Sequence, residues 1–177
     1  MAQQTELAPE TLRGIKLFNS LSDAELADLA TIGQALAVGI GERFIHEGDT
    51  SRDLYVLHRG AVRVLKQDDD GPVELASPRA EAVFGEMALV QGHPRAASVE
   101  AIQPSELIRL DADAFHAWLA AGQLTAYKLA YAILERLTIR QACLNREIIG
   151  LSAQAAQCAD SDTILNLRNS LYEQDLV

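Results

Sequence analysis

The chain has 177 residues, which fits one domain, or one domain with an appendage. Its 49% apolar and 23% charged residues are typical of a globular protein and exclude a disordered one. Fifteen Lys and Arg against 25 Asp and Glu give a net charge of −10, which argues against general binding to nucleic acid or anionic membranes. No signal peptide and no long apolar run are visible in the sequence. The two cysteines, Cys143 and Cys158, are too few for a disulfide framework. We therefore expect a cytoplasmic protein with unreactive thiols.

The N-terminal segment is expected to form two helices. Pro9 is a residue type that begins helices, and apolar residues follow it at a spacing of three as far as Phe18. Ser22 and Glu25 have the spacing of a capping box, which predicts a second helix. Gly33 indicates where that helix ends.

The middle of the chain, residues 34–110, changes to a period of two, with turn signals between short β-rich runs. Residues 68–71, Asp-Asp-Asp-Gly, are best explained as a solvated hairpin tip, because the other ligands of a calcium loop are missing. The pattern predicts a barrel or sandwich of about seven strands or more. The expected strands are Ala35–Ile40, Arg43–His46, Leu54–Leu57, Ala61–Lys66, Val73–Ala76, Ala96–Ile102 and Leu107–Leu110.

The last third becomes helical again, with a short helix over Asp111–Ala121 and a long one from about Leu124 to Ser152. Apolar residues of the long helix recur in steps of three and four, a heptad pattern with one polar member, Gln141. A helix of roughly 40 Å can hardly be covered by one short domain, so we expect a parallel homodimer through this seam. The seam comprises Tyr127, Ala130, Leu134, Leu137, Gln141, Leu144, Ile148 and Leu151. Residues 153–177 form a short tail, expected to be partly helical after a cap at Asp160.

The segment Phe84–Val99 lies between two strand patterns, where a barrel would need only a turn. Gly85 permits a sharp exit from the preceding strand, and Glu86 begins a stretch just long enough for one helical turn with free backbone N–H groups. Arg95 lies on the far arm of the loop and can fold back toward that turn. A guanidinium opposite free amides predicts a small anionic ligand that carries a phosphate, and Glu86 is placed to accept from a sugar hydroxyl.

These residues resemble the cyclic nucleotide-binding domain family, which includes the catabolite activator protein, protein kinase A regulatory subunits and cyclic nucleotide-gated channels. The family's phosphate-binding cassette is similar to Phe-Gly-Glu-Met-Ala-Leu followed by Pro-Arg-Ala-Ala-Ser-Val here, and Gly41 to Gly60 resembles its strand–turn–strand signature. The resemblance covers about residues 17–149. It implies a mainly β fold with flanking helices, a β-roll or jelly-roll (double-stranded β-helix) barrel, within a domain of residues 1–152 that includes the long helix. Glu81 stands near a position where the family usually has glycine.

The resemblance also implies roles for individual residues. Arg95 would pair with the cyclic phosphate and Glu86 with the ribose 2′-hydroxyl, while Arg140 and Gln141 fall where contacts to the purine arise. A solvated helix residue remains an alternative for Arg140, and a register device for Gln141. Ala96 stands where cGMP-preferring members often have Thr, which favours cAMP as ligand and leaves cGMP as the second choice. The sugar-phosphate would be lined by Gly85 and by the backbone of Met87, Ala88, Ala96 and Ala97.

The tail is too short and too acidic for the winged helix that reads DNA in the activator family, so we expect no direct DNA binding. The expected function is a stand-alone, non-enzymatic cyclic nucleotide receptor that signals to a partner protein through its long helix and tail. One alternative is a ligand-free dimerisation module of the same fold, in which Arg95 and Glu86 form a structural ion pair. Another is a cupin-type metal enzyme, which the four histidines support poorly because no His-x-His pair is present.

Overall fold

The computed structural model describes residues 3–155, and the chain divides into two units, residues 1–133 and 134–177. The predicted tail, with Cys158 and the expected cap at Asp160, lies outside the described residues. In the part that is described, no helix has both the length and the apolar character needed to cross a membrane.

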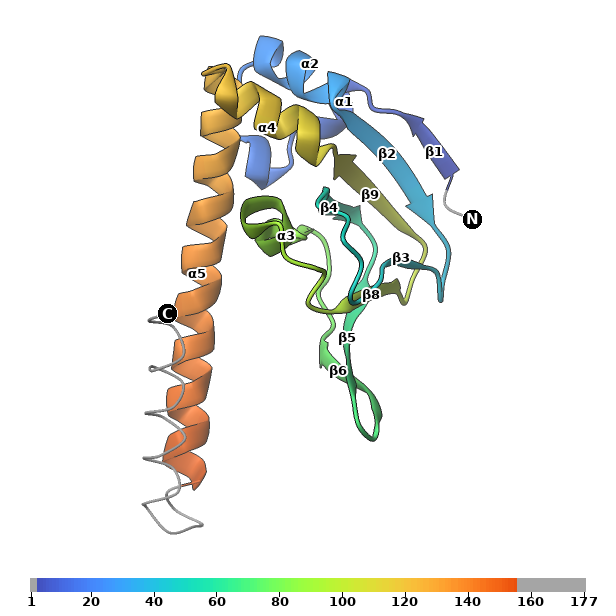
Figure 1. The fold of residues 1–177 in the computed structure, drawn as a ribbon, viewed down its shortest axis with the longest axis vertical. Coiled ribbons are helices and arrows are strands. Elements are labelled where there is room, and N and C mark those ends of the chain that lie inside the picture. Colours follow the sequence, from blue (N-terminus) through green and yellow to red (C-terminus); the bar gives the residue numbers. More distant parts are fainter. Residues whose placement is uncertain (1–2, 156–177) are drawn as a thin grey trace. The chain divides into compact units, whose positions relative to one another are not determined.

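Two antiparallel sheets form the body of the first unit (Figure 1), with strand orders β1-β2-β9-β4-β7 and β3-β8-β5-β6. The expected jelly-roll fold with flanking helices is confirmed. All seven expected strands are present, and β1 and β7 are additional. The strands are β1 (Gln3–Glu6), β2 (Gly33–Val38), β3 (Arg43–Ile45), β4 (Leu54–Arg59), β5 (Val62–Asp68), β6 (Gly71–Ala76), β7 (Ala82–Phe84), β8 (Ser98–Ala101) and β9 (Ser105–Leu110).

The core between the sheets explains why the alternating pattern was informative. Val99 and Ala101 of β8 point into the core, whereas the side chains of Ser98 and Glu100 on its other face take part in polar contacts. Burial of an apolar side chain contributes about 1.5–3 kcal/mol, so the alternation fixes which face of each strand packs inward. The core cluster combines both sheets and comprises Leu36, Val38, Ile45, Tyr55, Leu57, Val62, Phe84, Val99, Ala101 and Leu107.

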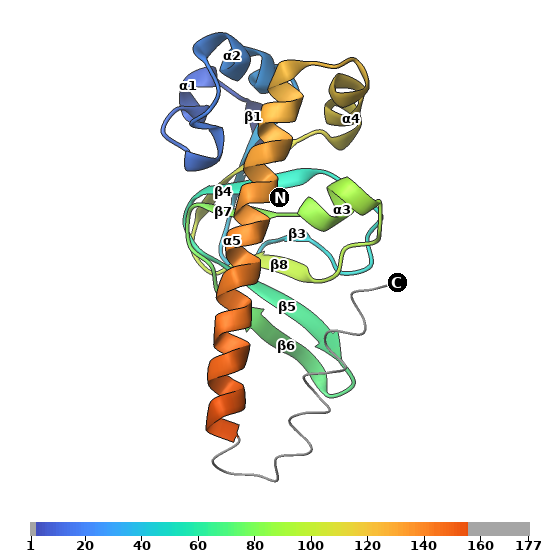
Figure 2. The ribbon, with the colours of Figure 1, turned by 90° about the vertical axis from the view of Figure 1, so that its left-hand side faces the viewer.

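The helices α1 (Pro9–Leu12), α2 (Asp23–Thr31) and α4 (Ala112–Ala120) gather at one end of the two sheets, and the β5–β6 hairpin extends beyond the other end (Figures 1 and 2). The predicted capping box is present: Ser22 Oγ accepts from the Glu25 amide, and Glu25 Oε2 accepts from the Ser22 amide. The expected single helix from Pro9 to Phe18 is wrong in detail, because Gly14 has a φ of 81° and separates α1 from a 3-10 helix over Lys16–Phe18.

The long helix α5 (Leu124–Ala155) begins in the first unit and continues into the second. In the first unit, Ala126, Leu129 and Ile133 are buried and lie on one face at helical spacing. Tyr127 lies on a different face and is exposed. In the second unit the seam positions Leu134, Leu144 and Ile148 are exposed, while the side chain of Leu151 lies outside the described ones. The predicted helix is therefore confirmed, and several seam positions expose apolar side chains, whereas Ala130 and Leu137 are half-buried.

Candidate functional site

The segment that carries the phosphate-cassette motif forms a tight turn, a short helix and a returning arm. Strand β7 ends at Phe84, Gly85 caps the helix α3 (Glu86–Gln91), and the arm returns through Arg95 to β8. Gly85 has a φ of 89°, a conformation that side chains rarely adopt. A Cβ atom there would also lie 2.6 Å from the Asp53 carbonyl oxygen and would collide with the Arg95 guanidinium. Only glycine therefore lets Arg95 occupy its place behind the turn.

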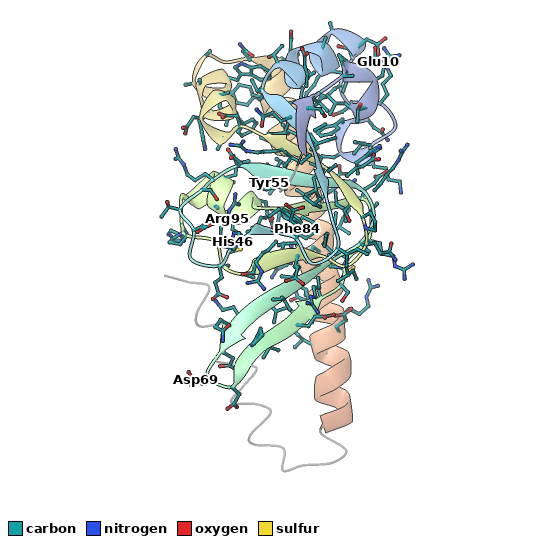
Figure 3. All side chains as sticks on the ribbon, turned by 90° about the vertical axis from the view of Figure 1, so that its right-hand side faces the viewer. Glu10, His46, Tyr55, Asp69, Phe84 and Arg95 are labelled. Atoms are coloured by element: carbon teal, nitrogen blue, oxygen red, sulfur yellow. The ribbon has the colours of Figure 1, made fainter. Side chains whose placement is uncertain are left out.

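Arg95 is the buried cation of this site, with a side chain that is 4% exposed. Its Nη2 donates to the carbonyl of Asp53 at 2.7 Å, and its Nε donates to Ser51 Oγ at 3.2 Å. Its guanidinium carbon lies 5.7 Å from the centre of the Tyr55 ring, a distance suited to a cation–π contact. Figure 3 shows Arg95 and Tyr55 within the barrel, while Asp69 marks the tip of the β5–β6 hairpin.

One nitrogen of this guanidinium, Nη1, is buried and has no hydrogen-bond partner among the described residues. Burial lowers the pKa of Arg95 from its ordinary value, and the nearby Tyr55 and the carboxylates of Asp53, Asp49 and Glu86 oppose that shift. An arginine remains protonated at neutral pH even so, and a buried donor without a partner is costly. The site therefore has the properties expected of a receptor for a small anion, which would satisfy Nη1 and offset the buried charge.

The backbone around Arg95 is held by the turn that follows β3. The Arg95 amide donates to the carbonyl of Asp49 at 2.8 Å, and the Gly48 amide donates to the carbonyl of Arg95 at 2.9 Å. In addition, the Glu47 amide of the same turn donates to Ser98 Oγ at the start of β8, at 3.0 Å. These bonds fix where the side chain of Arg95 starts, independently of any ligand.

Asp53 connects Arg95 to the start of α4. Its carbonyl accepts from Arg95, while its carboxylate accepts from Arg109 Nε at 2.7 Å and from the Ala112 amide at 3.0 Å. Ser51 and Asp53 are neighbours of Arg95 that the sequence did not predict. No pattern could identify them, because Asp53 contacts Arg95 through its main chain and Ser51 lies in an irregular loop.

The structure brings most of the predicted ligand residues together. Gly85 is in close approach to Arg95, and Glu86 is buried and contributes to the electrostatic field at Arg95. On the short helix, the side chain of Met87 is exposed and that of Ala88 is buried. Ala96 and Ala97 continue the arm after Arg95, exposed and half-buried respectively.

The two predicted base contacts belong to the second unit of the chain. Arg140 and Gln141 lie on α5 in the second unit, where both are exposed. Their roles therefore stay predictions.

The histidines of the described part do not gather. His46 Nδ1 lies 3.6 Å from the carboxylate of Asp49, and His116 Nε2 lies 2.8 Å from the carbonyl of Leu89 on α3. Across residues 3–155, no group of three or more His, Cys, Asp or Glu side chains is arranged to hold a metal ion.

Comparison with known proteins finds similarity to the family that the sequence motifs resemble. Residues 37–121 match the family model of the cyclic nucleotide-binding domain. The chain is 34% identical over 113 residues to a cAMP-dependent protein kinase regulatory subunit of Aspergillus fumigatus, and 33% identical over 99 residues to the type II regulatory subunit of Drosophila melanogaster. These matches cover 64% and 56% of this chain but only 27% and 26% of those relatives.

A solved structure extends the match to the fold. The crystal structure of a cyclic nucleotide-binding domain from Methylobacillus flagellatus KT superimposes with a TM-score of 0.73 at 28% identity. That match covers 84% of this chain and 88% of the solved one. The matched residues 37–121 include the whole cluster around Arg95. Residues 37–121 are therefore similar in sequence to the cyclic nucleotide-binding domain, and the fold is that of a solved cyclic nucleotide-binding domain.

Proposed function

We propose that this chain is a cytoplasmic, non-enzymatic receptor that binds cAMP at Arg95 and passes the signal to a partner protein. The observation that carries the proposal is the buried guanidinium of Arg95, whose Nη1 has no described partner. A cyclic nucleotide carries one phosphate with a single delocalised charge, which matches one unsatisfied guanidinium nitrogen better than a polyphosphate would.

The surrounding groups fit the rest of such a ligand. The amides at the start of α3 have no acceptor within the helix, as is general for the first turn, and they supply further donors for phosphate oxygens. The carboxylate of Glu86 is an acceptor for a ribose hydroxyl. The charge of Arg95 would hold the phosphate of the nucleotide, and the hydrogen bond to Glu86 would orient its sugar.

The preference for cAMP over cGMP rests on Ala96. This residue offers no hydroxyl group to the amino group of a guanine, so nothing at this position favours cGMP. The two curated relatives are named as regulatory subunits of cAMP-dependent protein kinases. That name supports cAMP as the ligand here, with cGMP as the second choice.

The proposed output runs through α5. The seam residues Tyr127, Leu134 and Ile148 are exposed, and burying their side chains against a second copy would remove apolar surface from water. We propose a parallel homodimer along this seam, with Arg140 and Gln141 as contacts to the purine. The helix and the tail would then change their presentation to a partner protein when cAMP binds.

A thermal shift assay separates this function from its alternatives. Protein stripped of nucleotide is heated alone and with cAMP, cGMP or divalent metal ions. At a cAMP concentration one hundred times Kd, native-state binding adds about 2.7 kcal/mol and raises Tm by about 5–10 °C. No shift with either nucleotide would support a ligand-free dimerisation module, and a shift with metal alone would support a metal enzyme.

A further inference from the structure

The arm of the cassette joins its sheet only at Ser98, three residues after Arg95, and side chains replace the strand pairing before that point. Strands β5 and β8 pair from Val62 opposite Ala101 to Leu65 opposite Ser98. Continuing this register would place Gln67 opposite Ala96, but β8 begins only at Ser98. The backbone groups of β5 and of the arm therefore need other partners at this point.

Lys66 and Glu47 supply those partners. Lys66 Nζ donates to the carbonyl of Ala96 at 2.9 Å and pairs with Glu47 Oε1 at 2.6 Å. Glu47 Oε2 in turn accepts from the amide of Gln67 at 2.8 Å. The hydrogen bond from Lys66 is the largest cause that lowers the pKa of Glu47 from its ordinary value. An ion pair thus occupies the gap between β5 and the arm, and each of its members also bonds to the backbone.

The bond to Ala96 controls the orientation of one particular peptide. The peptide that joins Ala96 to Ala97 is planar, and in its trans form its C=O and N–H point in opposite directions. Lys66 holds the C=O toward β5, so the N–H of Ala97 points away from β5. The same arm is held on its other side by the bonds between Arg95 and the turn at Gly48 and Asp49.

We infer that Lys66 is a positioning residue for the nucleotide site, which together with Glu47 orients the Ala96–Ala97 peptide for contact with the ligand. The inference rests on the proposed function, in which the backbone of these two residues lines the sugar-phosphate. Lys66 does not contact the nucleotide itself. It acts through the carbonyl of Ala96: because the bond orders the arm before the ligand arrives, less conformational entropy is lost when the ligand binds.

The test measures cAMP affinity and nucleotide-free Tm for Lys66→Met, Lys66→Arg and the matched control Arg59→Met. Arg59 pairs with Glu106 at 3.5 Å on β4 and β9, so its loss removes the same charge and a comparable surface pair without touching the cassette. We expect Lys66→Met to weaken binding about fivefold, because the arm loses both the ion pair and the bond to Ala96. Lys66→Arg keeps a hydrogen-bond donor and should therefore retain most of the wild-type affinity for cAMP. Arg59→Met should bind cAMP as the wild type does.

Glu47→Gln removes the other charge of the ion pair and tests the same inference if Lys66→Met folds poorly. Because both residues act through one arrangement, the double variant should lose no more affinity than Lys66→Met alone. The inference is overturned if Lys66→Met binds within twofold of wild type, if Arg59→Met weakens binding equally, or if Lys66→Arg restores nothing. A wild-type protein that binds neither nucleotide would refute the proposed function and this inference with it.

Discussion

At the scale of single residues, the account depends on a buried guanidinium that the fold holds in place but does not fully satisfy. Two nitrogens of Arg95 are engaged by Asp53 and Ser51, and the third is not. Such an arrangement is unfavourable for stability alone, and it is typical of sites where binding supplies the missing interaction.

The first prediction concerns the loss of this cation. Arg95→Ala should weaken cAMP binding by about 3 kcal/mol, more than a hundredfold, because the phosphate loses its charged partner. Glu86→Ala should cost less, since one sugar hydroxyl is involved. Equilibrium dialysis measures both affinities, with Arg59→Ala as a control for net charge. Unchanged binding by Arg95→Ala would show that the phosphate does not bind at this residue.

The second prediction concerns nucleotide preference. Ala96→Thr adds a hydroxyl group at the exposed position after Arg95, where it would meet the amino group of a guanine. One such hydrogen bond contributes about 0.5–1.5 kcal/mol, so the ratio of cGMP to cAMP affinity should rise several-fold. Competition of both nucleotides for one fluorescent analogue measures this ratio. If the ratio does not change, Ala96 gives no basis for preferring cAMP.

The sequence predicted the residues of the site that follow one another in a motif, and missed those that only folding brings together. Gly85, Glu86 and Arg95 could be identified because the motif itself combines a turn, a helix start and a returning cation. Asp53 and Lys66 could not be identified, because each acts on the cassette through a main-chain carbonyl. The carbonyl contact of Asp53 requires no particular side chain at position 53, and the contact from Lys66 requires none at position 96, so no pair of residue types in the sequence reveals either contact.

At the scale of elements, local signals predicted the elements that carry their own pattern. The capping box at Ser22 and the heptad spacing of α5 are both borne out by the helices observed. Strand β1 was missed because Gln3–Glu6 has no alternating apolar residues and becomes a strand by pairing with β2. Strand β7 was missed because three residues are too few to show a period, although Val83 lies opposite Val56 in the sheet.

The third prediction concerns how the free energy of unfolding depends on acid pH, through the contact between Glu25 of α2 and Lys128 of α5. The hydrogen bond from Lys128, followed by that from the Ser22 amide, lowers the pKa of Glu25 from 4.5 to about 2. A depressed pKa stabilises the folded state above pH 4.5, and this contribution is lost as the pH falls toward 2.

Glu25→Gln removes the carboxylate that titrates, so its unfolding free energy should fall less steeply between pH 4.5 and 2 than that of the wild type. Urea unfolding at a series of pH values measures the slope. Glu10→Gln, which changes an exposed carboxylate on α1, is the control. An identical slope for Glu25→Gln and wild type would remove Glu25 from the explanation of acid unfolding.

At the scale of the whole molecule, the fold was predictable because the order of helices, alternating strands and a long helix leaves few architectures. The alternation placed the core correctly in both sheets, as Leu36 and Val38 of β2 and Val99 and Ala101 of β8 show. The sequence could not show what the heptad positions of α5 contact, because the spacing describes one surface and not its contacts.

The fourth prediction concerns assembly. Leu137→Asp places a charge in the proposed seam, and an unpaired buried charge there should convert a dimer to a monomer. Lys128→Asp would disturb the Glu25 pair, so Arg146→Asp, outside the seam positions, is the better control for a charge change on α5. Light scattering at tens of micromolar measures the mass. A wild type that is already monomeric, with and without cAMP, would refute the dimer.

The central claim is that this chain binds a cyclic nucleotide, and calorimetric titration of cAMP into nucleotide-stripped wild-type protein tests it most directly. We predict one site per chain with a Kd of about 1 μM or tighter, which corresponds to about −8 kcal/mol. Stripping must be verified by the absorbance of the denatured protein's supernatant, since bound nucleotide carried through purification would mask the heat. The absence of binding heat at several temperatures, with either cAMP or cGMP, would contradict the account.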